Sequence, residues 1–265
     1  MAKLVWDKRG ERTFELGVDR GVLYLEDGTG VVWNGLTSVQ ENFADTINVP
    51  IFIEGVRQVE FPIRGDFAAT LKAYTYPDAF LAYDGIAQLD VGLFTDNQPS
   101  KTFGLSYRTR AGNDVSGVDF GYKIHILYGL TATPIDSSYE TLGDDISPVE
   151  FSWEITSQPQ SPPGFFPTAH AIFDSRYMDA QLLGELEDVL YGTDILTPTL
   201  PSLADIITFI EGFGTILITD NGDGTWTATA PDVGGYITML DATTFQITGA
   251  TTVAIDANTY TISTT

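Results

Sequence analysis

Apolar and polar residues alternate along much of the first 200 residues of this chain, which is the period-two pattern of strands with one buried face. Phe151, Trp153 and Ile155 alternate with polar residues, and residues 122–128 carry a similar alternation. Aromatic and β-branched residues, which favour strands, are enriched in both segments. The pattern therefore predicts a mainly β fold, with each of these two segments forming one half-buried strand.

One large hairpin is predicted in the middle of the chain. Residues 101–110 and 122–130 are strand-like, and the segment between them, residues 111–121, is polar and contains glycine. Such a segment between two strand-like runs favours a loop. We therefore expect two paired strands joined by a long polar loop.

A helical pattern interrupts the strands. Asp174 or Ser175 is suited to cap its N-terminus, and a helix is predicted over about residues 175–191, before Gly192. Apolar residues recur there at helical spacing, and they are Met178, Leu182, Leu186, Val189 and Leu190. Polar residues occupy the opposite positions, so the helix is expected to lie on a sheet face. A weaker helical pattern covers residues 203–210, and four prolines within residues 158–167 predict a loop.

Charge and composition divide the chain unevenly. Of its 36 acidic and 13 basic residues, 24 acids and every base lie in residues 1–176, whereas 12 acids and no base lie in residues 177–265. Threonine makes up 15 of the 51 residues from Thr215 onward. We therefore predict a main domain over residues 1–200, a linker or short helix over residues 201–214, and a separate Thr-rich β module over residues 215–265.

Short strand-like runs fill the Thr-rich module. The sequence Asp220-Asn221-Gly222-Asp223-Gly224 contains Asn and Gly residues, which accept a positive φ, so it predicts a hairpin turn between strands at 216–219 and 225–229. Further runs follow at residues 236–240, 245–248, 252–255 and 259–263. We expect five or six short strands in this module.

The net charge of −23 and the pI near 4.1 limit the partners that the chain can bind. A surface this negative opposes the neutralisation of DNA phosphates and adsorption to anionic lipid. The absence of cysteine excludes disulfides, thiolate catalysis and zinc sites built on sulfur. No apolar run approaches the roughly 20 residues of a membrane span, and charges interrupt the N-terminal residues, so neither a membrane segment nor a secretory signal is predicted.

Two segments resemble catalytic or cofactor motifs only in part. Residues 28–33 begin like a dinucleotide-binding fingerprint, but Trp33 stands where the third glycine belongs. Residues 104–108 resemble a nucleophile elbow around Ser106, but Arg108 replaces the glycine that the sharp turn requires. A strand serine is the favoured reading of Ser106, and no bound cofactor is predicted.

The remaining polar residues also give no specific site. His125 lies within a strand-like run and His170 follows the proline-rich loop, so structural roles are favoured for both and no metal site is predicted. With 36 carboxylates, pairs at glycosidase spacing arise by chance. The acidic turn at residues 220–224 lacks the spacing of a calcium loop, although weak calcium binding there stays open. We therefore predict that the chain is not an enzyme.

Several long sequence blocks stand out across about residues 5–192. They are Trp6 with residues 10–12, then residues 17–24, 32–39, 73–78 with Phe80, 101–110, 112–114, 121–125, 151–154 and 186–192. In content and order these blocks resemble the major tail tube proteins of long-tailed bacteriophages, particularly those that infect actinobacteria.

The resemblance implies a β-sandwich or partly closed barrel with one flanking helix. It further implies a structural virion protein whose copies form rings of six, stacked into a tube through which DNA leaves the capsid. Its partners would be other copies of itself, a tape measure protein, and tail terminator and distal tail proteins. DNA would pass through the lumen without specific binding, no membrane would be involved, and assembly would take place in the host cytoplasm.

One segment departs from the resemblance, because residues 41–64 are more apolar than the polar loop of the family. Exposed apolar side chains of this number favour an interface. We therefore expect Ile51, Phe52, Ile53 and Phe61 to contact the next ring, with the Thr-rich module on the outside of the tube. The alternative is a plain hairpin folded onto its own core.

Two other function classes remain open. An acidic surface adhesin or carbohydrate-binding β protein is suggested by Trp226 and Tyr236, whose rings could stack on sugars. A glycan-degrading enzyme would need a cleft with two acids, one of raised pKa. No sequence motif supports the second class.

Overall fold

The computed structural model describes residues 4–43, 47–54, 56–63, 67–135, 137–139, 141, 148–212, 217–220, 225–229, 236–241, 244–248 and 253–256. The chain divides into two compact units, Met1–Leu203 and Ala204–Thr265. The first unit contains a large sheet and helix α1 (Ala180–Tyr191). The second contains nearly all of helix α2 (Leu203–Gly212) and five short strands.

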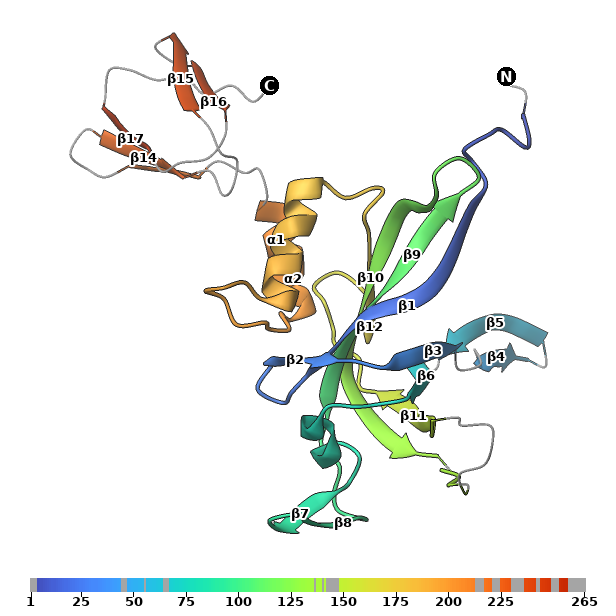
Figure 1. Ribbon diagram of the computed structural model, residues 1–265. Coiled ribbons are helices and arrows are strands. Elements are labelled where there is room, and N and C mark those ends of the chain that lie inside the picture. Colours follow the sequence, from blue (N-terminus) through green and yellow to red (C-terminus); the bar gives the residue numbers. More distant parts are fainter. Residues whose placement is uncertain are drawn as a thin grey trace. The chain divides into compact units, whose positions relative to one another are not determined.

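The main sheet of the first unit is antiparallel and has eight strands (Figure 1). Its path runs β2-β1-β9-β10-β11-β6-β3, and β12 pairs with β10 beside it. The strands are β1 (Thr13–Tyr24), β2 (Gly30–Trp33), β3 (Leu36–Phe43), β6 (Phe67–Ala73), β9 (Phe103–Asn113), β10 (Gly117–Pro134), β11 (Phe151–Ser157) and β12 (His170–Asp174). This confirms the mainly β fold, and within the described residues the path is open and does not close into a barrel.

The predicted hairpin is formed by β9 and β10, but its loop is much shorter than expected. The pairs Tyr122↔Arg110 and Gly117↔Asn113 belong to one ladder with a register shift, so most of the segment predicted as a loop is strand. The side-chain oxygen of Asn113 accepts hydrogen bonds from the backbone amides of Val115 (3.0 Å) and Ser116 (2.6 Å). This Asn turn closes the hairpin locally, which the polar composition alone does not indicate.

Strand β10 is buried on both faces over Ile124–Tyr128, where a half-buried strand was expected. On one face Leu127 belongs to the main hydrophobic core. On the other face Tyr24 lies near helix α1, because its hydroxyl donates to the carbonyl of Leu190 at 2.8 Å. A strand that is covered on both faces loses the simple alternation of apolar and polar residues.

Aromatic rings form the centre of the core. Phe80, on the short 3₁₀ helix η1 (Asp78–Ala82), lies 4.6 Å from the ring of Trp33 and 5.1 Å from that of Trp153, measured between centroids. The two indole N–H groups are satisfied, since Trp33 donates to the Thr75 carbonyl at 2.9 Å and Trp153 donates to Asp84 at 2.7 Å. The alternation predicted for residues 151–156 is confirmed, with Trp153 and Ile155 buried.

Helix α1 begins at Ala180, several residues later than predicted. Its N-cap is Asp179, whose side chain accepts hydrogen bonds from the amides of Gln181 (2.8 Å) and Leu182 (3.2 Å). Asp174 instead ends β12 and binds the guanidinium of Arg176. The apolar face of helix α1 is buried as predicted, through Leu182, Leu183, Leu186 and Leu190.

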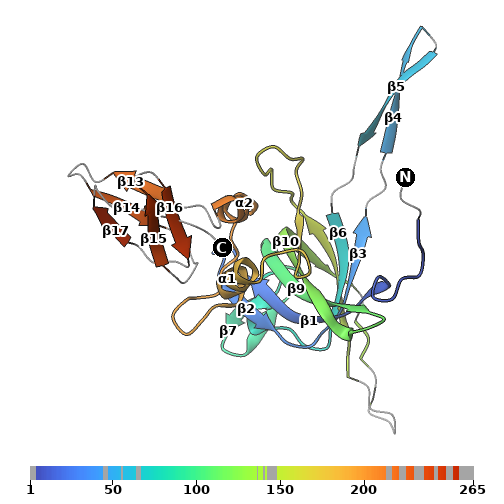
Figure 2. The same ribbon diagram turned by 90° about the horizontal axis from the view of Figure 1, so that it is seen from above.

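Two further hairpins belong to the first unit and pair with no other strand of the described chain (Figure 2). One consists of β4 (Ile47–Ile53) and β5 (Val56–Ile63), and the other of β7 (Ala87–Asp90) and β8 (Leu93–Thr95). The proline-rich segment 158–167 is a loop, as predicted, with a single bridge between Gln160 and Thr168.

The second unit contains two small antiparallel sheets besides α2. One sheet has the order β13-β14-β17, and the other pairs β15 with β16. The strands are β13 (Leu217–Asp220), β14 (Thr225–Thr229), β15 (Tyr236–Asp241), β16 (Thr244–Thr248) and β17 (Val253–Asp256). The predicted hairpin of β13 and β14 is present, and the strand predicted at residues 259–263 lies outside the described residues.

No helix in the described part of the chain is long and apolar enough to cross a bilayer.

Candidate functional site

The four residues predicted to contact a neighbouring ring lie on one hairpin. Ile51, Phe52 and Ile53 are at the end of β4, and Phe61 is on β5. Among the described strands, β4 and β5 pair only with each other. Contact of these residues with a second copy stays a prediction.

The β4–β5 ladder has the same register as the ladder of the last two strands of the main sheet. In the β3–β6 ladder Phe43 pairs with Phe67, and in the β4–β5 ladder Ile47 pairs with Ile63, so the partners' residue numbers have the same sum in both. The residues that join the two ladders, 44–46 and 64–66, lie outside the described part of the chain. We call the two ladders together the long hairpin, and its base is part of the sheet.

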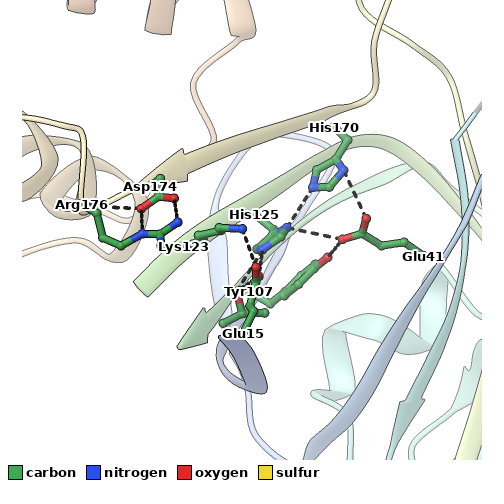
Figure 3. A network of polar contacts seen from close by, with 9 residues as sticks. Glu15, Glu41, Tyr107, Lys123, His125, His170, Asp174 and Arg176 are labelled. Atoms are coloured by element: carbon green, nitrogen blue, oxygen red, sulfur yellow. Dashed lines mark hydrogen bonds and ion pairs between the residues drawn. The ribbon is translucent and has the colours of Figure 1, made fainter. Parts of the chain in front are cut away.

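A polar cluster lies at the base of this hairpin, on the face of the sheet that carries the core (Figure 3). Its four members come from four strands: Glu41 from β3, Tyr107 from β9, His125 from β10 and His170 from β12. Strand pairing does not place Glu41 beside the other three residues, because β3 and β10 are not neighbours in the sheet path. The folding of the whole sheet brings Glu41 to them.

The nitrogen and oxygen atoms of the cluster converge. His125 Nδ1 lies 3.1 Å from His170 Nε2 and 3.4 Å from Glu41 Oε1. Tyr107 donates its hydroxyl hydrogen to Glu41 Oε1 at 2.7 Å. His125 Nδ1 therefore lies close to both an imidazole nitrogen and a carboxylate oxygen, so that three ligand-type atoms gather in one place.

A second tier of polar groups supports the far side of the His125 ring. His125 Nε2 lies 3.1 Å from Thr109 Oγ1 and 3.4 Å from Glu15 Oε1. Glu15 is itself paired with Lys123. Lys123 and Glu15 are partly exposed, and they continue the network of Figure 3 on the side of His125 away from His170.

Burial and pairing set the charges of the cluster. The adjacent His125 imidazole, together with the Tyr107 hydroxyl, lowers the pKa of Glu41 to about 2, although burial opposes this shift. Burial lowers the pKa of His170 to about 4, because the protonated ring loses its hydration. Glu41 is therefore a carboxylate at neutral pH, and His170 is a neutral imidazole.

A different ion-pair network lies on the helix-facing side of the sheet. Arg108 binds Asp19 in a bidentate manner, with Nε and a terminal nitrogen 2.7 and 2.8 Å from the two carboxylate oxygens. The same guanidinium lies 5.1 Å from the centre of the Tyr122 ring. Arg20 reaches Glu187 of α1 at 3.5 Å, which ties the helix to β1.

The partial motifs of the sequence fall in structural positions. Ser106 is fully buried in β9 with its hydroxyl 3.2 Å from that of Tyr24, so it is a strand serine as predicted. Residues 30–33 of the other motif form strand β2 itself, and no helix begins there. Asp220 ends β13, and residues 221–224 of the acidic turn lie outside the described residues. Trp226 and Tyr236 lie on β14 and β15.

The histidine cluster was missed by sequence reasoning. His125 and His170 are 45 residues apart, and Glu41 lies much earlier in the chain. No fixed spacing links residues that meet only through strand order, so no motif could reveal them. One signal was available in the sequence. The chain contains only two histidines, and His125 lies within a predicted strand.

Comparison with known proteins gives neighbours only at the level of structure. No protein-family model and no curated protein matches the chain. The tube-terminating cap of the anti-feeding prophage is 13% identical, with a TM-score of 0.32 over 66% of this chain and 97% of that chain. The sheath–tube complex of an extracellular contractile injection system contains a chain that is 16% identical, with a TM-score of 0.31 over 58% of this chain and 88% of its own length.

A third structure, the sheath and tube terminator of that injection system, is 11% identical, with a TM-score of 0.29 over 64% of this chain and 99% of that chain. All three structures are tube, sheath–tube or cap components of phage-tail-like particles.

Proposed function

We propose that this chain is a tail tube subunit, a structural protein of a phage-type tail. Copies of the chain close into rings, with six subunits as the expected number, and the rings stack into a tube. The tube conducts the genome, and it is assembled in the host cytoplasm and carried in the virion.

The observation that carries this proposal is the way the resembling blocks assemble in the fold. The blocks at residues 17–24, 32–39, 101–110, 121–125 and 151–154 are scattered along the chain. Residues 32–33 lie on β2 and residues 36–39 on β3, and the other blocks lie mainly on β1, β9, β10 and β11. Strands β2, β1, β9, β10 and β11 are consecutive in the sheet path, and β3 is at its other end. The resemblance to tail tube proteins therefore covers five consecutive strands of the sheet and part of its last strand.

The open sheet also has the edges that ring formation requires. In the described part of the chain β2 pairs only with β1, and β3 pairs only with β6. An unpaired strand edge presents backbone N–H and C=O groups that a second chain can bind. A neighbouring copy on each side would occupy both edges, which favours a closed ring.

The long hairpin suits the contact between rings. Its β4–β5 ladder has the register of the β3–β6 ladder, and no other described strand pairs with it. A hairpin without further strand partners in its own subunit is available to contact the next ring of a stack. We assign Ile51, Phe52, Ile53 and Phe61 to this contact.

The charge of the chain fits a conduit for DNA. A net charge of −23 per subunit repels phosphate and opposes adhesion of the passing genome. Salt confines this repulsion to about 8 Å, so only the acids that line the lumen contribute.

Two variants test the assembly. Purified wild-type protein is expected to show rings or tubes with a central hole by negative-stain electron microscopy. Phe52→Asp is expected to leave folded rings but to block tubes. Val115→Asp adds the same charge at an exposed turn of the β9–β10 hairpin and is expected to assemble as wild type does. Unfolding of Phe52→Asp would instead place the hairpin in the subunit's own core.

A further inference from the structure

We propose that Glu41, His125 and His170 form a binding site for a divalent transition-metal ion, with Zn²⁺ as the best fit. The three residues offer one carboxylate oxygen and two imidazole nitrogens, and these atoms all lie within 4.8 Å of one another.

Two of the three donor–donor distances are close to those of tetrahedral coordination. Zn²⁺ binds imidazole nitrogen and carboxylate oxygen at about 2.0–2.2 Å, so neighbouring ligands of a tetrahedron lie about 3.3–3.5 Å apart. His125 Nδ1 is 3.1 Å from His170 Nε2 and 3.4 Å from Glu41 Oε1. His170 and Glu41 are further apart, with 3.8 Å between His170 Nδ1 and Glu41 Oε2, so these two side chains would move toward each other around a common ion.

The ring orientation of His125 is fixed before any ion binds. Its imidazole stacks on the ring of Tyr107, with centroids 4.6 Å apart and 8° between the planes. Nitrogen lone pairs lie in the plane of the ring, so the stack directs Nδ1 sideways, toward His170 and Glu41. Little ordering of this side chain is then left for the ion to impose.

The ligands also have the outer partners that metal sites use. His125 Nε2, the nitrogen away from the proposed ion, faces Thr109 Oγ1 at 3.1 Å and Glu15 Oε1 at 3.4 Å. A carboxylate or hydroxyl on this nitrogen holds the tautomer in which the other nitrogen is free to ligate. Tyr107 orients the Glu41 carboxylate in a similar way, because its hydroxyl donates a 2.7 Å hydrogen bond to Oε1.

The donor types select among metals. Two imidazoles and one carboxylate suit Zn²⁺ and its transition-metal neighbours, whereas Ca²⁺ and Mg²⁺ prefer sites made of oxygen alone. Three protein ligands leave the fourth tetrahedral position to a water molecule or to a group from another subunit.

A bound ion would join parts of the sheet that are not paired. Glu41 is on β3, at one end of the sheet path, whereas His125 and His170 are on β10 and β12. The ion would therefore fix the base of the long β3–β6 hairpin to the middle of the sheet. An ion that binds only the folded chain raises the melting temperature.

The test uses the full-length chain without a histidine tag, after removal of metal with EDTA and dialysis. Isothermal titration with ZnCl₂ in excess Mg²⁺, which occupies the other carboxylates, is expected to give one Zn²⁺ per chain. His170→Gln and Glu41→Gln are each expected to weaken binding at least about 100-fold. Glu26→Gln removes a carboxylate that pairs with Lys101 elsewhere and is expected to bind as wild type does.

Two further readouts use the wild-type chain, so that a misfolded variant does not decide the result. Added Zn²⁺ is expected to raise the melting temperature, and Co²⁺ is expected to give the intense visible absorption of a tetrahedral ion. Since both histidines of the chain lie in the cluster, any imidazole-dependent binding reports on this site. Absence of stoichiometric binding, or binding unaffected by His170→Gln in a folded variant, would overturn the proposal.

Discussion

The imidazole of His125 lies nearly parallel to the phenol ring of Tyr107, with centroids 4.6 Å apart and 8° between the planes. The two residues are directly opposite each other in the β9–β10 ladder, so the register of the central hairpin creates the stack. The hydroxyl of Tyr107 extends past the stack to Glu41. One local pair of strands therefore positions two polar groups against a third that comes from a distant strand.

Tyr107→Phe separates the stack from the hydrogen bond. The variant keeps the aromatic ring but removes the donor to the largely buried Glu41 carboxylate. Hydrogen bonds to charged groups contribute about 1.5–3 kcal/mol, so we expect a loss of about 1–2 kcal/mol in the free energy of unfolding. Urea titration with EDTA present measures it. Tyr139→Phe, at an exposed tyrosine, is the control, and equal stability of the two variants would contradict the role of Tyr107.

The ion pair of Asp19 is expected to make the fold less stable in acid. The bidentate hydrogen bond with Arg108 lowers the pKa of Asp19 below its ordinary value of 3.8. A carboxylate with a depressed pKa stabilises the fold above its ordinary pKa, and this stabilisation is lost as the pH falls through the lower folded value. We expect Asp19→Asn to cost about 2 kcal/mol at pH 7, because it leaves the half-buried Arg108 without its partner.

The pH profile of the same variant distinguishes the ion pair from simple packing. The stability difference between wild type and Asp19→Asn is expected to shrink as the pH falls below the ordinary pKa of 3.8, because Asp19 is protonated there in the unfolded chain before it is protonated in the fold. Urea midpoints measured between about pH 2 and pH 7 give this profile. A difference that stays constant over the whole range would show that the charge of Asp19 is not what stabilises the fold.

The free energy of unfolding is expected to depend on the ionisation of Asp84 in the opposite direction. Burial raises the pKa of Asp84 above its ordinary value of 3.8, although the hydrogen bond from Trp153 lowers it in part. A carboxyl group with a raised pKa favours the fold below its ordinary pKa, and this contribution is lost as the pH rises through the folded value. Asp84→Asn keeps an acceptor for the Trp153 indole, so the variant should gain stability relative to wild type between about pH 4 and pH 7. A relative loss over that interval would be the contradicting result.

Truncation of Phe80 is expected to destabilise the core strongly. Its side chain is fully buried and lies within 5.1 Å of the Trp33 and Trp153 rings, measured between centroids. Truncation of a buried Phe to Ala removes apolar burial and leaves a cavity, so Phe80→Ala should cost about 3–5 kcal/mol. Phe165→Ala removes an exposed ring and should change stability by less than about 0.5 kcal/mol. Thermal and urea unfolding compare the two.

The sequence predicted the features that depend on neighbouring residues. The alternation around Trp153 and the apolar spacing around Leu186 each reflect a single element that buries one face, and both are present. Errors arose where a nearby side chain determines the boundary. The turn at Asn113 shortened the predicted loop, and the cap at Asp179 moved the start of the helix.

Features that depend on distant strands were beyond sequence reasoning. The burial of β10 on both faces follows from the position of α1, and α1 follows β10 by some fifty residues along the chain. The cluster of Glu41, His125 and His170 requires the order of β3, β10 and β12 in the sheet. Strand order is a long-range property that residue patterns within one strand do not encode.

A cryo-electron microscopy reconstruction of the particle that contains this chain tests the proposed tube directly. We expect the chain to form stacked rings in the shaft between the capsid and the tail tip, with the β4–β5 hairpin against the next ring and a bore rich in carboxylates. Placement of the chain outside the shaft, or a bore in which arginines bind the DNA phosphates, would contradict it.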